Sequence, residues 1–254
     1  MTQRESRPVA LITGGTTGIG LATAKALHAD GYAVVITGRN PDTLAAARNT
    51  LPEDVVVLRA DAAVLADADT VAEEIQRRFG RLDVVYLNAA IAIPRPFQDL
   101  TEEHFDTHFA INVKGQYFTL RRVLPLLTEG ASVIFCSSVI EQRALPGMSV
   151  YTASKGALTA LARTLAVELA PRGIRVNVIS PGAIDTPAFT KQGLPPEVLD
   201  GLKADLIRRI PLGRIGTDAE IARAVAFLVS PAASYITGAN LVVDGAMFVS
   251  ASAS

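Results

Sequence analysis

Short runs of apolar residues, many of them β-branched, recur along the chain, and most are apolar at every position rather than alternating. Strands that helices cover on both faces have this pattern, which is typical of a parallel sheet. The runs predict seven strands, over Val9–Thr13, Ala33–Thr37, Val55–Leu58, Asp83–Asn88, Ser132–Cys136, Val176–Ser180 and Leu241–Val243.

Longer segments between these runs carry apolar residues at helical spacing and predict helices over Gly18–Asp30, Thr70–Phe79 and Thr152–Ala170. Thr217, followed by Glu220, has the capping-box pattern and predicts the start of a last helix. Strands that alternate with helices in this way form stacked right-handed β-α-β units. The predicted fold class is therefore α/β: a Rossmann-like, doubly wound, mainly parallel seven-stranded sheet with helices on both faces.

One stretch interrupts the alternation, because residues 182–216 contain no predicted strand. An insertion of that length inside a compact domain is more often a lid or binding loop than a plain connection. We therefore predict a substrate lid there, within a single domain over residues 1–254. Residues 1–6 and 250–254 are predicted to be loose ends.

Composition and charge narrow the classes of function. Of the 254 residues, 49% are hydrophobic and 19% charged, with a formal net charge of -1, which excludes global disorder and a broad nucleic-acid-binding face. The single Cys136 excludes an intrachain disulfide, and no apolar run is long enough for a membrane span. The polar start MTQRESRP predicts no signal peptide. We expect a cytoplasmic protein that acts on a small molecule, without a nucleic-acid or membrane partner.

The segment Thr13–Gly20, TGGTTGIG, leads from the first predicted strand directly into a helix. A turn that receives a phosphate needs tight backbone, free amide groups and no side chain in the approach path, which glycines provide. The spacing differs from the commonest dinucleotide fingerprint, and no Lys-Ser/Thr pair follows as in a Walker loop. An ordinary glycine-rich turn is the alternative, but the strand–turn–helix context favours a dinucleotide site.

The end of the second predicted strand bears on the choice of cofactor. An acidic residue there bonds the ribose 2′-hydroxyl of NAD(H), whereas an arginine accommodates the 2′-phosphate of NADP(H). The chain has Arg39 and Asn40 at this point and no carboxylate, which favours NADP(H) over NAD(H). The alternative is that Arg39 is only a solvated residue at a helix start.

Tyr151 and Lys155 are four positions apart at the start of a predicted helix, so they share one face. A phenol is a poor acid or base at neutral pH, and a nearby ammonium group favours its ionised form. Ser138 follows the fifth predicted strand, where its hydroxyl is placed to bond a substrate oxygen while the tyrosine transfers a proton. Each signal alone is weak, because a Tyr-x-x-x-Lys pair is often a surface pair.

Two further groups have ordinary structural explanations. His104 and His108 have the spacing of metal ligands on a helix, but no third ligand accompanies them in the sequence, so no metal site is predicted. Cys136 lies in an apolar run, which predicts a buried, unreactive thiol.

In combination, the glycine turn, Ser138, Tyr151 and Lys155 resemble the short-chain dehydrogenase/reductase family, in the branch whose chains are about as long as this one. The resemblance extends from Val9 to about Ala246. The family's TGxxxGIG motif is matched in full, whereas its N-N-A-G motif falls on Leu87–Ala90 and keeps only the second Asn and the Ala. The two departures put the geometry of that loop in doubt.

The resemblance implies a role for each matching residue. Tyr151 is the expected general acid in reduction and base in oxidation, Lys155 holds the cofactor ribose and lowers the tyrosine pKa, and Ser138 polarises the carbonyl. Asn112 is expected to anchor a proton-relaying water. The catalytic residues are thus Asn112, Ser138, Tyr151 and Lys155. The implied cofactor contacts are Gly14, Thr16, Thr17, Gly18, Ile19, Gly20, Arg39, Asn40, Asp61, Ala62, Asn88, Ala89, Ala90, Tyr151, Lys155, Pro181, Gly182, Ile184 and Thr186.

The expected activity is hydride transfer between NADP(H) and a ketone or secondary alcohol. The alternatives are an NAD(H)-dependent sugar, polyol or hydroxysteroid dehydrogenase, and a dinucleotide-sensing protein without turnover. By the same resemblance we expect a homotetramer. Residues predicted to surround the substrate are the apolar Ile91, Ile93, Pro94, Phe97, Val139, Leu145, Met148 and Phe189 and the polar Arg95, Glu141, Gln142 and Arg143.

Overall fold

The computed structural model describes residues 7–187 and 196–250. Residues 1–6 and 251–254, which belong to the predicted loose ends, lie outside the described residues, as do residues 188–195 of the predicted lid. Phe189, predicted beside the substrate, is therefore outside them as well.

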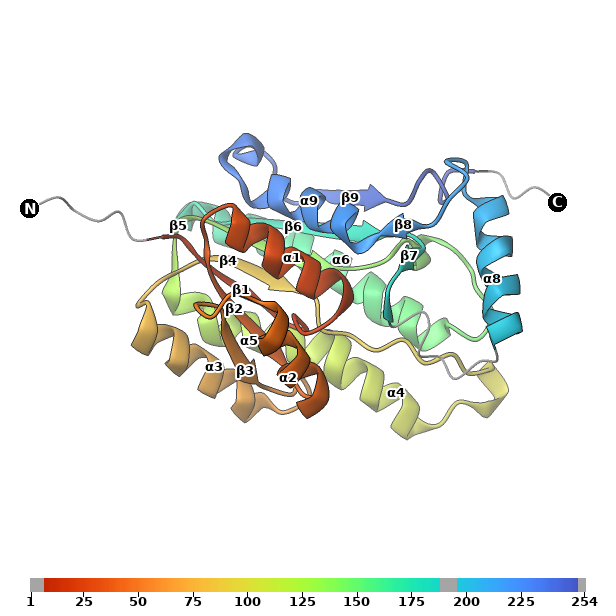
Figure 1. Cartoon of the computed structure of the whole chain (residues 1–254), viewed down its shortest axis with the longest axis horizontal. Helices are drawn as coiled ribbons and strands as arrows, with labels where there is room; N and C mark the ends of the chain where they lie inside the picture. Colours follow the sequence, from red (N-terminus) through yellow and green to blue (C-terminus); the bar gives the residue numbers. More distant parts are fainter. Residues whose placement is uncertain (1–6, 188–195, 251–254) are drawn as a thin grey trace, which may run out of the picture.

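Seven parallel strands form the central sheet in the order β3-β2-β1-β4-β5-β6-β9 (Figure 1). All seven predicted strands are present, and the predicted fold class is confirmed. The strands are β1 Val9–Ile12, β2 Ala33–Gly38, β3 Val56–Arg59, β4 Leu82–Leu87, β5 Leu127–Cys136, β6 Arg175–Pro181 and β9 Asn240–Val243.

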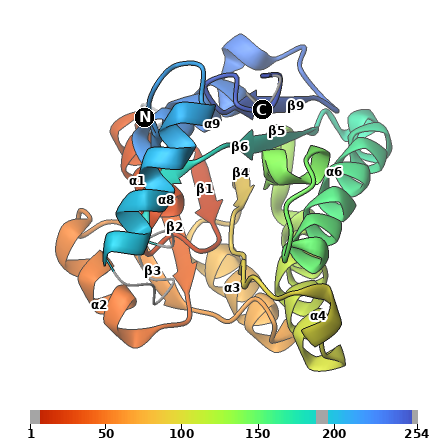
Figure 2. The same cartoon turned by 90° about the vertical axis from the view of Figure 1, so that its right-hand side faces the viewer.

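Helices cover both faces of this sheet (Figure 2). The α-helices are α1 Gly18–Ala29, α2 Pro41–Thr50, α3 Leu65–Arg78, α4 Glu102–Phe109, α5 Gln116–Val123, α6 Ser149–Leu169, α8 Pro196–Arg209 and α9 Asp218–Val229. A π-helical segment, Ala110–Gly115, joins α4 to α5, and a 3-10 turn, Val139–Gln142, follows β5. None of the helices in the described ranges is long and apolar enough to cross a membrane.

The alternation of side chains along each strand divides the core into two layers. In β1, Val9 and Leu11 pack with the residues of α3, α5 and α6, whereas Ala10 and Ile12 pack with those of α1, α2 and α9. Both sets are buried, which is why the strands read as continuous apolar runs.

The segment 182–216 differs from the prediction that it holds no strand. Two short strands, β7 Ile184–Asp185 and β8 Gly216–Thr217, pair in parallel and bring its two ends together. The prediction was wrong because two-residue strands are too short to produce a periodic pattern. In the sequence α8 lies between β7 and β8, and in the fold it lies near the carboxyl end of the sheet (Figure 1).

Candidate active site

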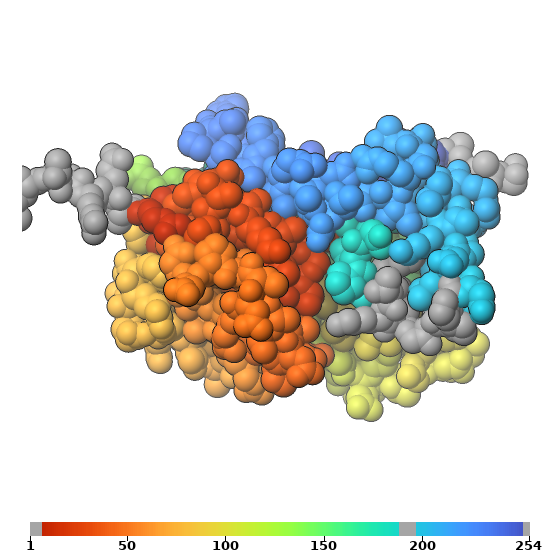
Figure 3. Space-filling model, viewed as in Figure 1, coloured from red at the N-terminus to blue at the C-terminus, as the bar shows by residue number. Residues whose placement is uncertain are grey.

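A cleft of about 850 Å³ opens over the carboxyl ends of β1, β2, β4, β5 and β6, where ligands of doubly wound sheets bind. In Figure 3 it falls where the red and orange first part of the chain meets the teal residues near β7. The lining includes these predicted cofactor contacts: Gly14, Thr16, Thr17, Gly18, Ile19, Arg39, Asn40, Asp61, Ala62, Asn88, Ala89, Ala90, Tyr151, Lys155, Pro181, Gly182, Ile184 and Thr186.

The glycine turn between β1 and α1 forms one wall of the cleft. Gly14 and Gly18 have positive φ angles of 63° and 50°, and a Cβ on Gly14 would meet Ala89 Cα at 2.9 Å. Gly20, which was predicted to contact the cofactor, does not line the cleft. A Cβ there would meet the Gly14 carbonyl oxygen at 2.3 Å, so this glycine lets α1 pack against the turn.

The start of α1 fits an anionic ligand. Its N-cap, Thr17, makes no side-chain hydrogen bond to the first turn, so the N–H groups there keep their capacity to bind an anion. This observation, together with the close backbone approach at Gly14, fits the diphosphate of a dinucleotide.

Asn88, the residue after β4, is hydrogen-bonded to the glycine turn. Its Nδ2 donates to the carbonyl oxygens of Thr13 and Gly14, each at 3.1 Å, while its backbone N–H donates to Thr13 Oγ1 at 2.9 Å. The departure at Leu87 places a buried leucine in the core, and Ala90 lies in the cleft wall. The retained asparagine thus makes the contacts that hold the loop to the turn.

Arg39 and Asn40 stand at the end of β2. The Arg39 side chain is 55% exposed and donates to Asp61 at 3.3 Å, at the edge of the cleft. Asn40 caps α2 by accepting the N–H groups of Asp42 and Thr43. Thr43, which the sequence analysis missed, also lines the cleft and donates to Thr16 Oγ1 at 3.1 Å. Its place in the first turn of the helix after Arg39 is the signal that could have identified it.

Ser138, Tyr151 and Lys155 meet in the opposite wall of the cleft. Ser138 follows the end of β5, and its hydroxyl is close enough to the Tyr151 phenol to lower the pKa of that phenol. Lys155 lies one turn further along α6, with Nζ 5.6 Å from the centroid of the Tyr151 ring. The same Nζ donates to the Cys136 carbonyl oxygen at 2.7 Å.

The pKa of Tyr151 departs from its ordinary value in the direction opposite to the one expected. Burial raises it most, the charge of Cys136 raises it further, and only the hydrogen bond with Ser138 lowers it. Burial also lowers the pKa of Lys155, against the charges of Cys136 and Glu141, which raise it. The expected lowering of the tyrosine pKa by Lys155 is therefore not found: Lys155 is not among the groups that shift the Tyr151 pKa, and desolvation dominates.

Asn112 lies behind the cleft, fully buried in the π-helical segment. Its side chain forms a reciprocal pair with the backbone of Ile91, accepting its N–H at 2.8 Å and donating to its carbonyl at 2.9 Å. A second donation reaches Ser154 Oγ on α6 at 3.0 Å. Asn112 thus ties the loop after β4 to the helix that carries Tyr151 and Lys155.

His108 is fully buried and has two hydrogen bonds of its own. Its Nδ1 donates to the His104 carbonyl at 2.8 Å and its Nε2 accepts the Ile93 N–H at 3.2 Å, which is the pattern of a neutral imidazole. Among the residues that the structure describes, no group of three His, Cys, Asp or Glu side chains is placed to hold a metal ion.

The predicted substrate surroundings are only partly brought together. Ile91 and Ile93 line the cleft, whereas Phe97 is 80% exposed. Glu141 points into a cluster of polar side chains beneath α6 instead of serving as a polar group for substrate. Cys136 is buried, as predicted, yet it also reaches the cleft wall.

Comparison with known proteins extends over nearly the whole chain. A family model described as enoyl-(acyl carrier protein) reductase matches residues 14–247. The 2-(R)-hydroxypropyl-CoM dehydrogenase of Xanthobacter autotrophicus is 38% identical over 247 residues, covering 94% of this chain and 97% of that protein.

Two solved structures from Brucella melitensis have the same fold. One, a short-chain dehydrogenase/reductase described as a glucose/ribitol dehydrogenase, has a TM-score of 0.89 and 34% identity, covering 96% of this chain and 97% of its own. The other, a 3-ketoacyl-(acyl-carrier-protein) reductase complexed with NADH, has a TM-score of 0.87 and 31% identity, covering 95% and 98%. Matches of this extent and identity show that the protein is an oxidoreductase of the short-chain dehydrogenase/reductase family.

Proposed function

We propose that the protein transfers hydride between NADP(H) and a ketone or secondary alcohol, with Tyr151 as the general acid and base. The observation that carries this proposal is that Ser138, Tyr151 and Lys155 line the same cleft as the glycine turn. A dinucleotide-sensing protein has no need for a phenol, a hydroxyl and a buried lysine at this place.

In this mechanism a bound nicotinamide supplies or accepts the hydride. In reduction, the Tyr151 hydroxyl donates its proton to the substrate carbonyl oxygen, and in oxidation the phenolate accepts it back. Ser138 holds and polarises that oxygen through a hydrogen bond. Lys155, in its ammonium form, favours the phenolate that is left after proton donation.

The remaining parts of the proposal concern binding. The first turn of α1 holds the diphosphate, Lys155 binds the nicotinamide ribose, and Arg39 receives the 2′-phosphate. Support for NADP(H) comes from the cation at the end of β2, where no carboxylate is present. We also propose a cytoplasmic location, a role for residues 182–216 as a substrate lid, and assembly as a homotetramer.

Replacing Tyr151 by Phe tests the mechanism. The Tyr151→Phe variant retains cofactor binding, measured by NADPH fluorescence, but its kcat for ketone reduction falls by about 10²–10⁴-fold because proton transfer is lost. The matched control is Tyr86→Phe, since Tyr86 is buried in β4 outside the lining of the cleft. This control is expected to keep its kcat.

The assay follows absorbance at 340 nm over a panel of ketones, with NADPH and with NADH. Near-full activity of Tyr151→Phe would rule out the proposed acid. Cofactor binding without turnover of any ketone or secondary alcohol would favour a sensing protein instead.

A further inference from the structure

Beneath α6, four polar groups converge on the carboxylate of Glu141, a partly buried residue of the 3-10 turn after Ser138. The Ser137 hydroxyl lies 3.1 Å from Oε2, and the Thr159 hydroxyl bonds to the same oxygen. On the other side, the side-chain amides of Asn240 and Gln142 donate to Oε1 at 2.8 and 3.1 Å.

All four neighbours of this carboxylate can donate a hydrogen bond, which is the environment that an ionised carboxylate requires. Asn240 is held on both sides, because its Oδ1 accepts from the Ser180 hydroxyl at 2.7 Å while its amide nitrogen donates to Glu141. The cluster joins residues that follow β5, residues of α6 and the first residue of β9.

The same cluster contacts the backbone of Lys155. The hydroxyl oxygens of Ser137 and Thr159 lie 3.0 and 3.4 Å from the Lys155 carbonyl oxygen. Lys155 is itself buried, and its ammonium group has a carbonyl oxygen, that of Cys136, as its hydrogen-bond partner. A buried cation without a nearby anion is costly to maintain, since desolvation favours the neutral amine.

We propose that Glu141 is a positioning residue that supplies the counter-charge for Lys155 and fixes the Lys155 turn of α6 against the ends of β5 and β9. The proposal deepens the proposed function, on which it rests. It assigns the role of keeping Lys155 cationic to a side chain outside the lining of the cleft. The charged and titratable groups that act on Lys155 are Cys136 in β5, Glu141 in the 3-10 turn and Tyr151 in α6.

The direct test is the titration of Lys155 by NMR in protein labelled with ¹³C at lysine Cε, with Lys155→Met identifying the signal. In Glu141→Gln, the midpoint for Lys155 moves to lower pH by about one unit, because an opposite charge no longer favours the ammonium form. Glu141→Asp keeps the charge and shows a smaller shift. The control Glu168→Gln, on the exposed side of α6, removes the same charge and leaves the midpoint unchanged.

Kinetics supply a second readout. In Glu141→Gln, kcat/KM for ketone reduction declines at alkaline pH about one unit earlier than in the wild type. A merely structural role would lower the folded fraction and leave both the profile and the Lys155 midpoint in place, and that result would overturn the proposal. If Glu141→Gln does not fold, Glu141→Met removes the same charge, and an unshifted Lys155 midpoint in that folded variant overturns the proposal equally.

The NMR titration does not depend on turnover. A wild type that reduces no ketone with either cofactor would contradict the proposed function, whereas the Lys155 midpoint would still decide the role of Glu141.

Discussion

At the scale of single residues, Arg39 shows how one side chain can select a ligand. The guanidinium is more than half exposed at the cleft edge and has a carboxylate partner, Asp61, at 3.3 Å. An exposed pair of this kind contributes little to stability, so Arg39 is free to exchange Asp61 for a phosphate that binds it in bidentate fashion.

Replacing Arg39 by Ser therefore acts on cofactor choice more than on folding. The ratio of kcat/KM for NADPH to that for NADH is expected to fall by about ten- to a hundredfold. This corresponds to the binding free energy lost with a hydrogen bond to a charged group. Steady-state assays with both cofactors measure this ratio. Arg48→Ser is the matched control, because Arg48 is an exposed cation of α2 outside the cleft lining. A wild type that uses NADH as well as NADPH would refute the preference.

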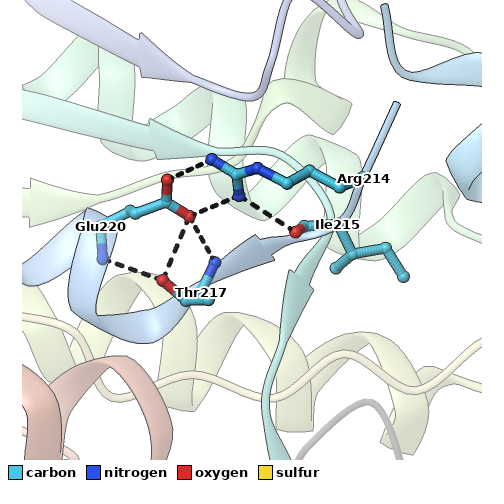
Figure 4. A network of polar contacts seen from close by, with 4 residues as sticks. All are labelled: Arg214, Ile215, Thr217 and Glu220. Carbon is cyan, nitrogen blue, oxygen red and sulfur yellow. Dashed lines mark hydrogen bonds and ion pairs between the residues drawn. The ribbon is translucent and has the colours of Figure 1, made fainter. Parts of the chain in front are cut away.

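At the scale of elements, the start of α9 fixes the end of the 182–216 segment. Figure 4 shows the reciprocal capping box, in which Glu220 N–H donates to Thr217 Oγ1 and Thr217 N–H donates to the Glu220 carboxylate. Arg214 adds two hydrogen bonds to this carboxylate, at 2.9 and 2.6 Å. Because Thr217 belongs to β8, which pairs with β7, the box also holds Ile184 in the cleft wall.

The capping box makes a contribution to stability that depends on pH. The hydrogen bond from Arg214, followed by that from the Thr217 N–H, holds the pKa of Glu220 at about 2, below its ordinary 4.5. A depressed folded-state pKa stabilises the protein above the unfolded value, and the effect is lost as the pH falls from 4.5 towards 2. Glu220→Gln is thus expected to melt below the wild type at pH 7, with a gap in Tm that closes over this interval.

Calorimetry from pH 7 to pH 2 measures the gap, and 1 M salt is expected to narrow it, because the ion pair is exposed. Glu168→Gln, which removes an exposed carboxylate from α6, controls for net charge. A gap that stays constant over the whole range would contradict the assignment.

The elements also show how far the sequence predicts the fold. The strands covered on both faces and the capping box could be predicted from the sequence, because each produces a pattern within a few neighbouring residues. β5 begins at Leu127, ahead of the predicted Ser132, because Leu127 pairs with Leu82 although Thr128–Gly130 interrupt the apolar run and the register shifts there. The π-helical segment holds Asn112 in hydrogen bonds with Ile91 and Ser154, which are distant in sequence, so periodicity did not predict it.

In the candidate site, too, features with a local sequence signal could be predicted and features that depend on distant contacts could not. The glycine turn and the Tyr151–Lys155 pair have fixed spacings, and the structure brings them to one cleft as predicted. The inward direction of Glu141 depends on Asn240, 99 positions away, and is invisible to any local pattern. The pKa of Tyr151 is raised instead of lowered because the side chain is buried, and burial is defined only by the folded chain.

At the scale of the whole molecule, the outer surface of α4, α5 and α6 carries exposed apolar side chains. Phe105, Tyr117 and Val167 are exposed, Val167 by 76%. Of these helices, α5 and α6 cover one face of the sheet and α4 packs against α6, so their outer sides are available to another copy of the chain. The proposed homotetramer would bury this surface.

Light scattering is expected to give four times the chain mass of 26.8 kDa at micromolar concentration. Val167→Asp is expected to lower this mass, since it places a charge in a buried apolar contact. The same substitution at Val64, an exposed valine next to α3, is the matched control and keeps the assembly. A wild-type mass equal to one chain would exclude the tetramer.

The contact between Glu141 and Asn240 has a consequence for biosynthesis. Ser138, Tyr151 and Lys155 leave the ribosome well before Asn240, which starts the last strand of the sheet. A nascent chain therefore holds every proposed proton-transfer residue while lacking the amide that orients the carboxylate beneath them. The catalytic arrangement is therefore completed only after β9 has joined the sheet.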